Sequence, residues 1–111
     1  MIGDYSGFRL MWIMVMFDLP VTSKQDRQAA TRFRNFLLDD GYQMSQFSVY
    51  LRFVGDRSKI PPYVKRVRQF APENGMVSIL FFTDKQLSET ITIQKRTLKE
   101  NPKKPEQLTL F

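Results

Sequence analysis

The chain has 111 residues, of which 42% are apolar, and ten of them are Phe. This length fits one domain with a single core, and the apolar content is typical of folded globular proteins. The sequence contains no Cys and no His, which excludes disulfides, zinc–thiolate sites and catalytic triads built on histidine. Any metal must therefore be a hard cation held by oxygen atoms, such as magnesium, manganese or calcium.

The formal net charge of +6, from 17 Lys and Arg against 11 Asp and Glu, favours an anionic partner. Nucleic acid is the first candidate and an acidic membrane surface is the second. The longest apolar run falls short of the ~20 residues that a membrane span needs. Residues 1–10 carry Asp4 and lack the leading basic cluster of a signal peptide. We therefore expect a cytoplasmic protein with no membrane partner.

The first predicted element is the apolar run 11–17, which is followed directly by Asp18 and then by a proline at position 20. This pattern indicates a strand buried on both faces, with one carboxylate at its tip. Apolar residues then recur at helical spacing and predict a helix over about 24–40. Ser23 is placed to cap this helix, and Gly41 is placed to end it.

The rest of the chain is predicted to form alternating strands and helices. In chain order these are a strand over 42–54, in which Ser45 and Gln46 predict a kink, a bulge or a tight turn between two short strands, a helix over about 60–71, a strand over 76–83, a short helical turn within 84–90 and a weaker strand over 91–94. The order predicts an α+β, ferredoxin-like βαββαβ sandwich, in which helices cover one face of an antiparallel sheet. We assign residues 1–94 to this domain and 95–111 to a basic C-terminal extension that ends in a β segment.

The predicted sheet has apolar side chains on both faces. Trp12 and Met14 alternate along the first strand with Ile13 and Val15, but helices are available to cover one face only. The other face would be an exposed apolar patch, which is typical of an interface. We expect a homodimer formed through this sheet face, because twofold self-association is the commonest closed assembly. The alternative is that the C-terminal extension folds back over its own sheet.

Asp18 is the main candidate for chemistry in a chain without His or Cys. A carboxylate at a strand end suits a divalent cation, but magnesium prefers one or two carboxylates together with water and phosphate oxygens. A dimer that brings two copies of the first strand together would supply the second carboxylate. The alternative is a loop residue that helps the chain to turn before the proline.

The basic residues are arranged on helix faces. Arg27 and Arg34 share the face of the first helix opposite its apolar stripe, and Lys65, Arg66 and Arg68 do the same on the second. Such charges bind phosphates without reading bases. We therefore favour a nucleic-acid surface, although an ordinary solvated helix face has the same appearance.

Several short motifs resemble those of a known family. These are Met-Phe-Asp-Leu-Pro at 16–20, Arg-Asn-Phe-Leu-Leu-Asp-Asp-Gly at 34–41 and Gln-Phe-Ser-Val-Tyr at 46–50. Together they resemble the small, ferredoxin-like CRISPR-associated (Cas) endoribonuclease-type protein that partners the integrase in spacer acquisition. The loop after Asp18 and the Gln-Phe-Ser-Val-Tyr form resemble the version found in type II systems.

The resemblance implies a homodimer that bridges integrase subunits and binds double-stranded DNA, with RNA as the alternative, on its basic surface. It also implies a magnesium-dependent (or manganese-dependent) endonuclease, with Asp18 as the catalytic metal ligand at the dimer interface. Ser48 and Tyr50 are implied to lie beside that site, and Arg27 matches an arginine early in the first helix. The alternative within this chemistry is a stand-alone, toxin-like endoribonuclease.

The C-terminal end is apolar after a basic, proline-containing stretch. Leu108 and Leu110 alternate with a threonine and precede Phe111, a short-strand pattern suited to adding onto an exposed sheet edge. The resemblance implies that this segment docks the neighbouring subunit and the integrase. The alternatives are a peptide that binds the sliding clamp and a frayed end.

Overall fold

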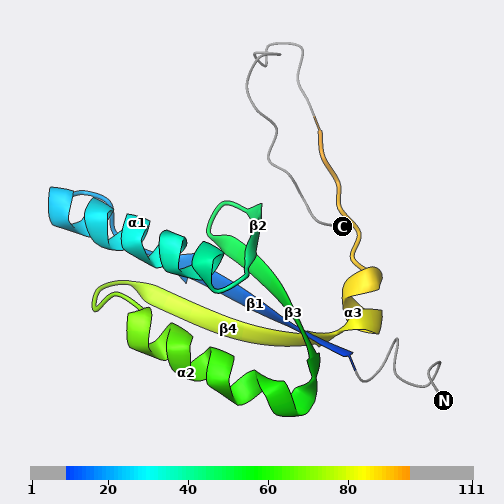
Figure 1. Cartoon of the computed structure of the whole chain (residues 1–111). Helices are drawn as coiled ribbons and strands as arrows, with labels where there is room; N and C mark the ends of the chain where they lie inside the picture. Colours follow the sequence, from blue (N-terminus) through cyan, green and yellow to red (C-terminus); the bar gives the residue numbers. More distant parts are fainter. Residues whose placement is uncertain (1–9, 96–111) are drawn as a thin grey trace.

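A computed structural model describes residues 10–95. The predictions for Leu108, Leu110 and Phe111 therefore lie outside the described residues. The elements are β1 (Leu10–Asp18), α1 (Lys24–Asp39), β2 (Gln43–Gln46), β3 (Val49–Asp56), a 3-10 turn (Arg57–Lys59), α2 (Ile60–Phe70), β4 (Met76–Thr83) and α3 (Asp84–Ser88) (Figure 1).

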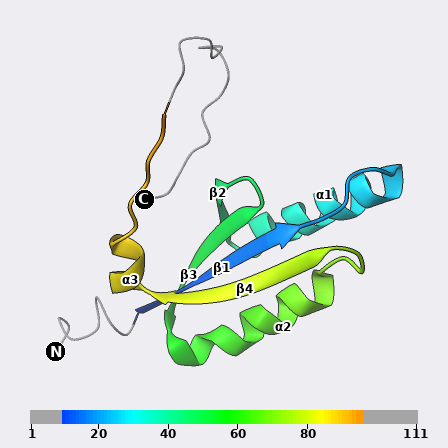
Figure 2. The same cartoon turned by 180° about the vertical axis from the view of Figure 1, so that it is seen from behind.

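The four strands form one sheet in the order β2-β3-β1-β4, with every neighbouring pair antiparallel. Helices α1 and α2 lie in front of the sheet in Figure 1, and the sheet lies in front of them when the molecule is seen from behind in Figure 2. Both helices therefore cover the same face. This arrangement confirms the predicted α+β, ferredoxin-like βαββαβ fold.

The core lies between this face of the sheet and the two helices. The side chains of Ile13 and Val15 on β1 have no exposed surface, and they pack in one cluster with Phe33 of α1 and Val67 of α2. The aromatic rings of Phe17 and Phe33 meet edge to face, with their centroids 5.2 Å apart. Strand β1 is central in the sheet, so its alternate side chains carry much of the core.

The ends of α1 agree with the caps expected from the sequence. The Ser23 hydroxyl accepts a hydrogen bond from the Asp26 backbone N–H at 3.0 Å. The helix ends at Asp39, one residue before the predicted end, and Gly41 follows with a φ of 93°. An added Cβ at Gly41 would lie 2.9 Å from Nε of Arg52, so this turn needs glycine for space as well as for its backbone conformation.

The predicted strand over 42–54 consists of β2 and β3, which are joined by a tight turn at Phe47 and Ser48. The register between the two strands shifts between Met44 and Gln46, which confirms the irregularity expected at Ser45 and Gln46. Strand β3 continues to Asp56, two residues beyond the predicted end of the strand at residue 54.

The second sheet face is partly uncovered. Met16 and Phe53 remain 41% and 42% exposed on this face. Helix α3 covers one end of it, where the Trp12 indole N–H donates to a carboxylate oxygen of Asp84 at 2.9 Å and Leu87 is buried. The apolar patch is therefore present but smaller than expected. A dimer through this face stays a prediction.

The weaker strand expected at 91–94 is wrong for the single chain. The structure assigns no strand to these residues, and Ile91 and Ile93 are 85% and 77% exposed. A strand exists only where a neighbouring strand accepts and donates its backbone hydrogen bonds, and none lies beside this segment among residues 10–95. The domain boundary at residue 94 stays a prediction. No described helix is long and apolar enough to cross a membrane.

Candidate functional site

Asp18 is exposed at the end of β1, where its register partner is Met76 at the start of β4. It lines a shallow pocket of about 260 Å³ on the uncovered side of the sheet. The other lining residues are Met16, Phe17, Phe47, Ser48, Val49, Met76 and Ser78. Asp18 and Ser48, which the family resemblance implies to be neighbours, therefore line the same pocket.

The pocket offers a carboxylate, serine hydroxyls and backbone carbonyls, which are the oxygen ligands that magnesium and manganese accept. Within residues 10–95, however, no group of three or more acidic side chains could hold a metal ion. A single chain supplies one carboxylate to this pocket, that of Asp18. The donor set fits a divalent cation as half of a site that a second copy of Asp18 would complete.

Ser48 is held beside Asp18 by its backbone. Its carbonyl oxygen accepts a hydrogen bond from the Phe17 N–H at 3.0 Å. It is also the only described residue other than glycine with a positive φ, at 61°. A left-handed conformation costs a serine about 1–2 kcal/mol, and such strain is often found at functional sites.

Tyr50 lies on the opposite face of the sheet from this pocket. Its side chain is 3% exposed in the core, and its ring stacks on that of Phe17 with the centroids 5.7 Å apart. Burial raises the pKa of the Tyr50 hydroxyl, while the charge of Arg34 opposes this effect. Tyr50 therefore neighbours the site only through Phe17 and supports the end of β1 from behind.

The arginines predicted on α1 have different local contacts. Arg27 donates to the carbonyl oxygens of Val21 and Thr22 at 3.1 and 3.2 Å, which closes the loop that precedes the helix. Arg34 is partly buried and donates to the Thr31 hydroxyl at 3.2 Å. Each of these contacts uses one terminal nitrogen, so both guanidinium groups keep other N–H donors for phosphates.

On α2 the three predicted basic residues divide into two classes. Lys65 and Arg68 are exposed. Arg66 instead donates from Nε to both carboxylate oxygens of Asp40 at 3.1 Å, and this hydrogen bonding raises the pKa of Arg66. Its guanidinium also lies 4.6 Å from the ring centre of Tyr63. Arg66 therefore joins α2 to the end of α1, in addition to any contact with nucleic acid.

Arg52 joins Arg66 beside Tyr63 and Asp40, and no sequence pattern pointed to it. Its guanidinium lies 4.5 Å from the ring centre of Tyr63, and its Nε donates to the Asp40 carbonyl oxygen at 2.9 Å.

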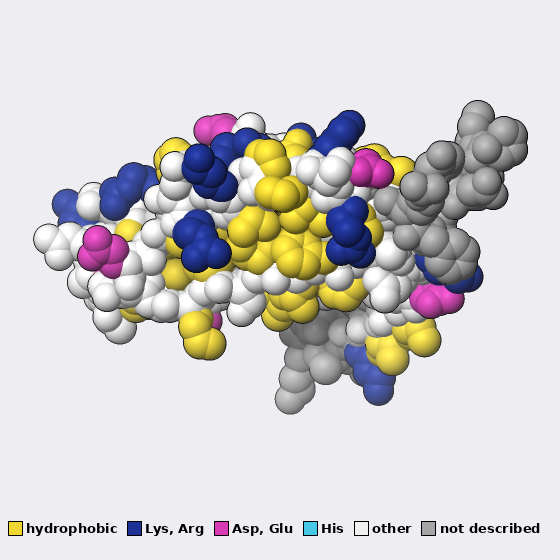
Figure 3. Space-filling view, turned by 90° about the horizontal axis from the view of Figure 1, so that it is seen from below, with side chains coloured by type: hydrophobic (Ala, Val, Ile, Leu, Met, Phe, Trp, Pro, Cys, Tyr) yellow, Lys and Arg dark blue, Asp and Glu magenta, His cyan; other side chains and the backbone are white. Residues whose placement is uncertain are grey.

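The face seen from below in Figure 3 shows a hydrophobic area in its middle, with Lys and Arg side chains on both sides. Basic groups around an apolar area can bind phosphates while the apolar area packs against a partner.

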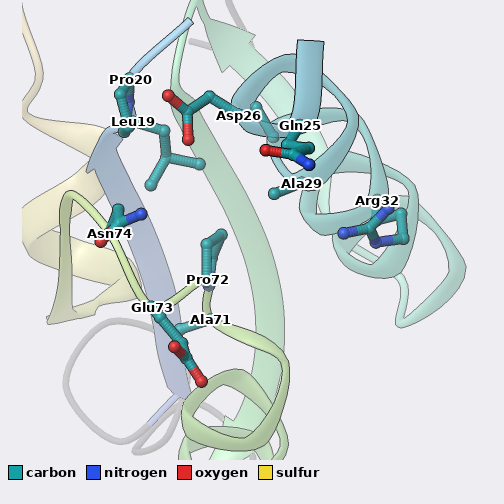
Figure 4. A pocket seen from close by; sticks show the side chains of 11 residues that line it. Leu19, Pro20, Gln25, Asp26, Ala29, Arg32, Ala71, Pro72, Glu73 and Asn74 are labelled. Atoms are coloured by element: carbon teal, nitrogen blue, oxygen red, sulfur yellow. The ribbon is translucent and has the colours of Figure 1, made fainter. Parts of the chain in front are cut away.

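Another pocket, of about 390 Å³, lies between the start of α1 and the turn from α2 to β4. Figure 4 shows that Leu19 and Pro20, the first turns of α1 and the segment 71–74 contribute to it. Its lining carries two carboxylates, those of Asp26 and Glu73, and one cation, Arg32. The excess of negative charge makes this pocket a poor site for phosphate. Asp26 and Glu73 lie far apart in the sequence, so no local sequence pattern could predict that they line the same pocket.

Comparison with known proteins connects this geometry to a family. The family described as CRISPR associated protein Cas2 matches residues 11–90. The chain belongs to the Cas2 family. The match includes Asp18, the turn with Ser48 and all of the sheet except Leu10, and it confirms the family predicted from the sequence motifs. The type II form stays a prediction.

Curated relatives cover nearly the whole chain. A protein of Paracidovorax avenae is 50% identical over 106 residues, which are 96% of this chain and 98% of the relative. A protein of Flavobacterium psychrophilum is 39% identical over 104 residues, which are 94% of this chain and 90% of the relative. Both relatives carry the name CRISPR-associated endoribonuclease Cas2.

Replacing Ser48 with Gly tests whether this residue acts through its backbone. Glycine adopts the left-handed conformation freely and keeps the carbonyl that binds Phe17. The free energy of unfolding in urea should therefore rise by up to about 1 kcal/mol, and metal-dependent cleavage should be unchanged. Loss of cleavage in a stable Ser48→Gly protein would instead assign the role to the hydroxyl.

Ser78→Gly is the matched control, because Ser78 lines the same pocket from a regular strand. Glycine within a strand should lower stability by about 0.5–1 kcal/mol. A fall in stability for both variants would contradict the backbone role of Ser48.

Proposed function

We propose that this chain is a dimeric, DNA-binding subunit of CRISPR spacer acquisition that bridges integrase subunits and has magnesium-dependent endonuclease activity. The observation that carries this proposal is the Asp18 pocket at the uncovered end of a Cas2-family sheet, whose single carboxylate would form half of a divalent-cation site. A half-site has a use only if two copies of the chain meet. The proposed dimer and the proposed activity therefore depend on the same surface.

The uncovered sheet face supports the homodimer. Met16 and Phe53 are exposed on it, and Met16 lines the same pocket as Asp18. Packing this face against a second copy would bury the apolar side chains. It would also bring the two Asp18 pockets towards the shared axis, where each chain would contribute one carboxylate.

The basic surface supports the nucleic-acid partner. Arg27 and Arg34 on α1, and Lys65 and Arg68 on α2, present cations with N–H donors that the described contacts leave available. Arg66 contributes its positive charge but is held by Asp40. Contacts of this kind position a duplex through its phosphates and carry no base specificity. We therefore propose double-stranded DNA as the main partner. We also propose that the protein is cytoplasmic.

For the nuclease, Asp18 of each chain would hold magnesium or manganese, with the Ser48 turn fixing the end of β1. A cation bound there would activate water and neutralise charge on the scissile phosphate. The names of the relatives favour RNA as one substrate of this activity. No described feature favours the alternative of a stand-alone toxin. The docking of the integrase by Leu108, Leu110 and Phe111 also stays a prediction.

Asp18→Ala should separate cleavage from bridging. Loss of a metal ligand should reduce cleavage of RNA and DNA by at least about 100-fold, because even residues that only support metal ligands are worth 10–100-fold. Spacer acquisition in cells that carry the integrase should persist if bridging is the main role. Gel-based cleavage assays, with EDTA as the metal-free reference, and sequencing of the repeat array measure the two properties.

Asp39→Ala is the control for that experiment, because Asp39 is also exposed but lies at the far end of α1. It should change neither readout. Undiminished cleavage by a nuclease-free preparation of Asp18→Ala would show that the metal site is wrongly assigned.

Duplex binding should be insensitive to sequence and should weaken steeply with salt. Replacing Lys65 and Arg68 together with Ala should reduce the slope of log affinity against log salt by about 1.8, which corresponds to two lost phosphate contacts. Lys85→Ala is the control, because Lys85 on α3 already pairs with Glu89, the residue after that helix, at 3.3 Å. Fluorescence anisotropy across a salt series measures the slope, and a double variant with the wild-type slope would exclude Lys65 and Arg68 from the DNA surface.

A further inference from the structure

Gly75 lies in the turn that leads from α2 into β4, directly before Met76, the register partner of Asp18. Its φ is 97°. An added Cβ would lie 2.7 Å from the Asp18 carbonyl oxygen and 3.1 Å from the Leu19 Cα. These are backbone atoms, which cannot rotate away as the end of a flexible side chain can. Figure 4 shows the segment with Asn74, the neighbour of Gly75, beside the end of β1 and Leu19.

We propose that Gly75 is a positioning residue for the Asp18 carboxylate. The lack of a side chain at Gly75 lets the turn pack directly on the peptide between Asp18 and Leu19. On the other side of β1, the Ser48 carbonyl holds the Phe17 N–H at 3.0 Å. The end of β1 is therefore clamped between two turns, and Asp18 has little freedom to move.

This clamp matters because of the geometry that the cation demands. Magnesium binds oxygen at 2.0–2.1 Å in a nearly ideal octahedron. A methyl group at Gly75 must push the Asp18 carbonyl away by several tenths of an ångström to reach an ordinary contact distance. The carboxylate is attached to the Cα next to that carbonyl, so it moves with it. In a site shared by two chains, the displacement would occur twice.

A matched control separates this contact from simple backbone strain. Gly55 has a φ of 92°, nearly the same as Gly75, but the nearest atom to its added Cβ is Phe53 Cε2 at 4.0 Å. Alanine at either position is therefore strained by a left-handed backbone. Only alanine at Gly75 collides with the peptide that carries Asp18.

The test compares Mn²⁺ binding by the full chain, the Gly75→Ala variant and the Gly55→Ala variant, measured by calorimetry and by electron paramagnetic resonance. We expect both variants to melt at lowered temperatures, and Gly75→Ala at the lower of the two, because its methyl group also collides with the Asp18 carbonyl. We expect only Gly75→Ala to weaken Mn²⁺ binding, by tenfold or more, with unchanged affinity for duplex DNA. Equal weakening in both variants, or wild-type binding by Gly75→Ala, would overturn the inference.

The inference rests on the proposed metal site, so Asp18→Ala is included in the same experiment. If Asp18→Ala binds Mn²⁺ as the wild type does, the metal site itself is wrong. If Asp18→Ala loses binding but Gly75→Ala keeps it, only the role of Gly75 is wrong. Should Gly75→Ala fail to fold, Gly75→Asn against Gly55→Asn gives the same comparison, because Asn tolerates a positive φ better than Ala does.

Discussion

The central position of β1 is the constraint on which the rest of the molecule depends. This strand pairs with β3 on one side and with β4 on the other, and Ile13 and Val15 along it are completely buried. A strand held on both edges and packed from one face cannot shift without breaking several backbone hydrogen bonds. Its last residue, Asp18, is therefore an exposed carboxylate on a rigid support, which suits a metal ligand better than a residue on a free loop does.

The proposed activity and the proposed assembly follow from the same shortage of carboxylates at the site. The pocket takes a single carboxylate from its own chain, while the uncovered sheet face beside it still exposes apolar side chains. Bringing two copies together would correct both deficits. The basic groups on α1 and α2 lie on the helical face of the sheet, so the proposed DNA binding need not compete with the proposed contact between copies. A bridge that retains a nuclease site is physically consistent with this division of faces.

The sequence predicted best those features that depend on local patterns. The bounds of α1 and β4 were correct to within one residue, because a capping serine, a terminal glycine and an unbroken apolar run define them. The contact of Arg66 with Asp40 was missed, since it joins residues 26 positions apart through packing that no local period encodes. The strand expected at 91–94 failed because a strand needs a neighbour as well as an alternating pattern. Ser48 was associated with Asp18 through the family resemblance alone, and its positive φ could not be read from a serine.

The most direct test of this account is the stoichiometry of Mn²⁺ binding, measured by calorimetry on protein whose oligomeric state is determined at the same concentration by analytical ultracentrifugation. If two copies of Asp18 complete one site, the protein sediments as a dimer and binds one ion for every two chains, and Asp18→Ala removes that ion. One ion bound by each chain of a monomeric protein would contradict the shared site, and with it the link between assembly and activity.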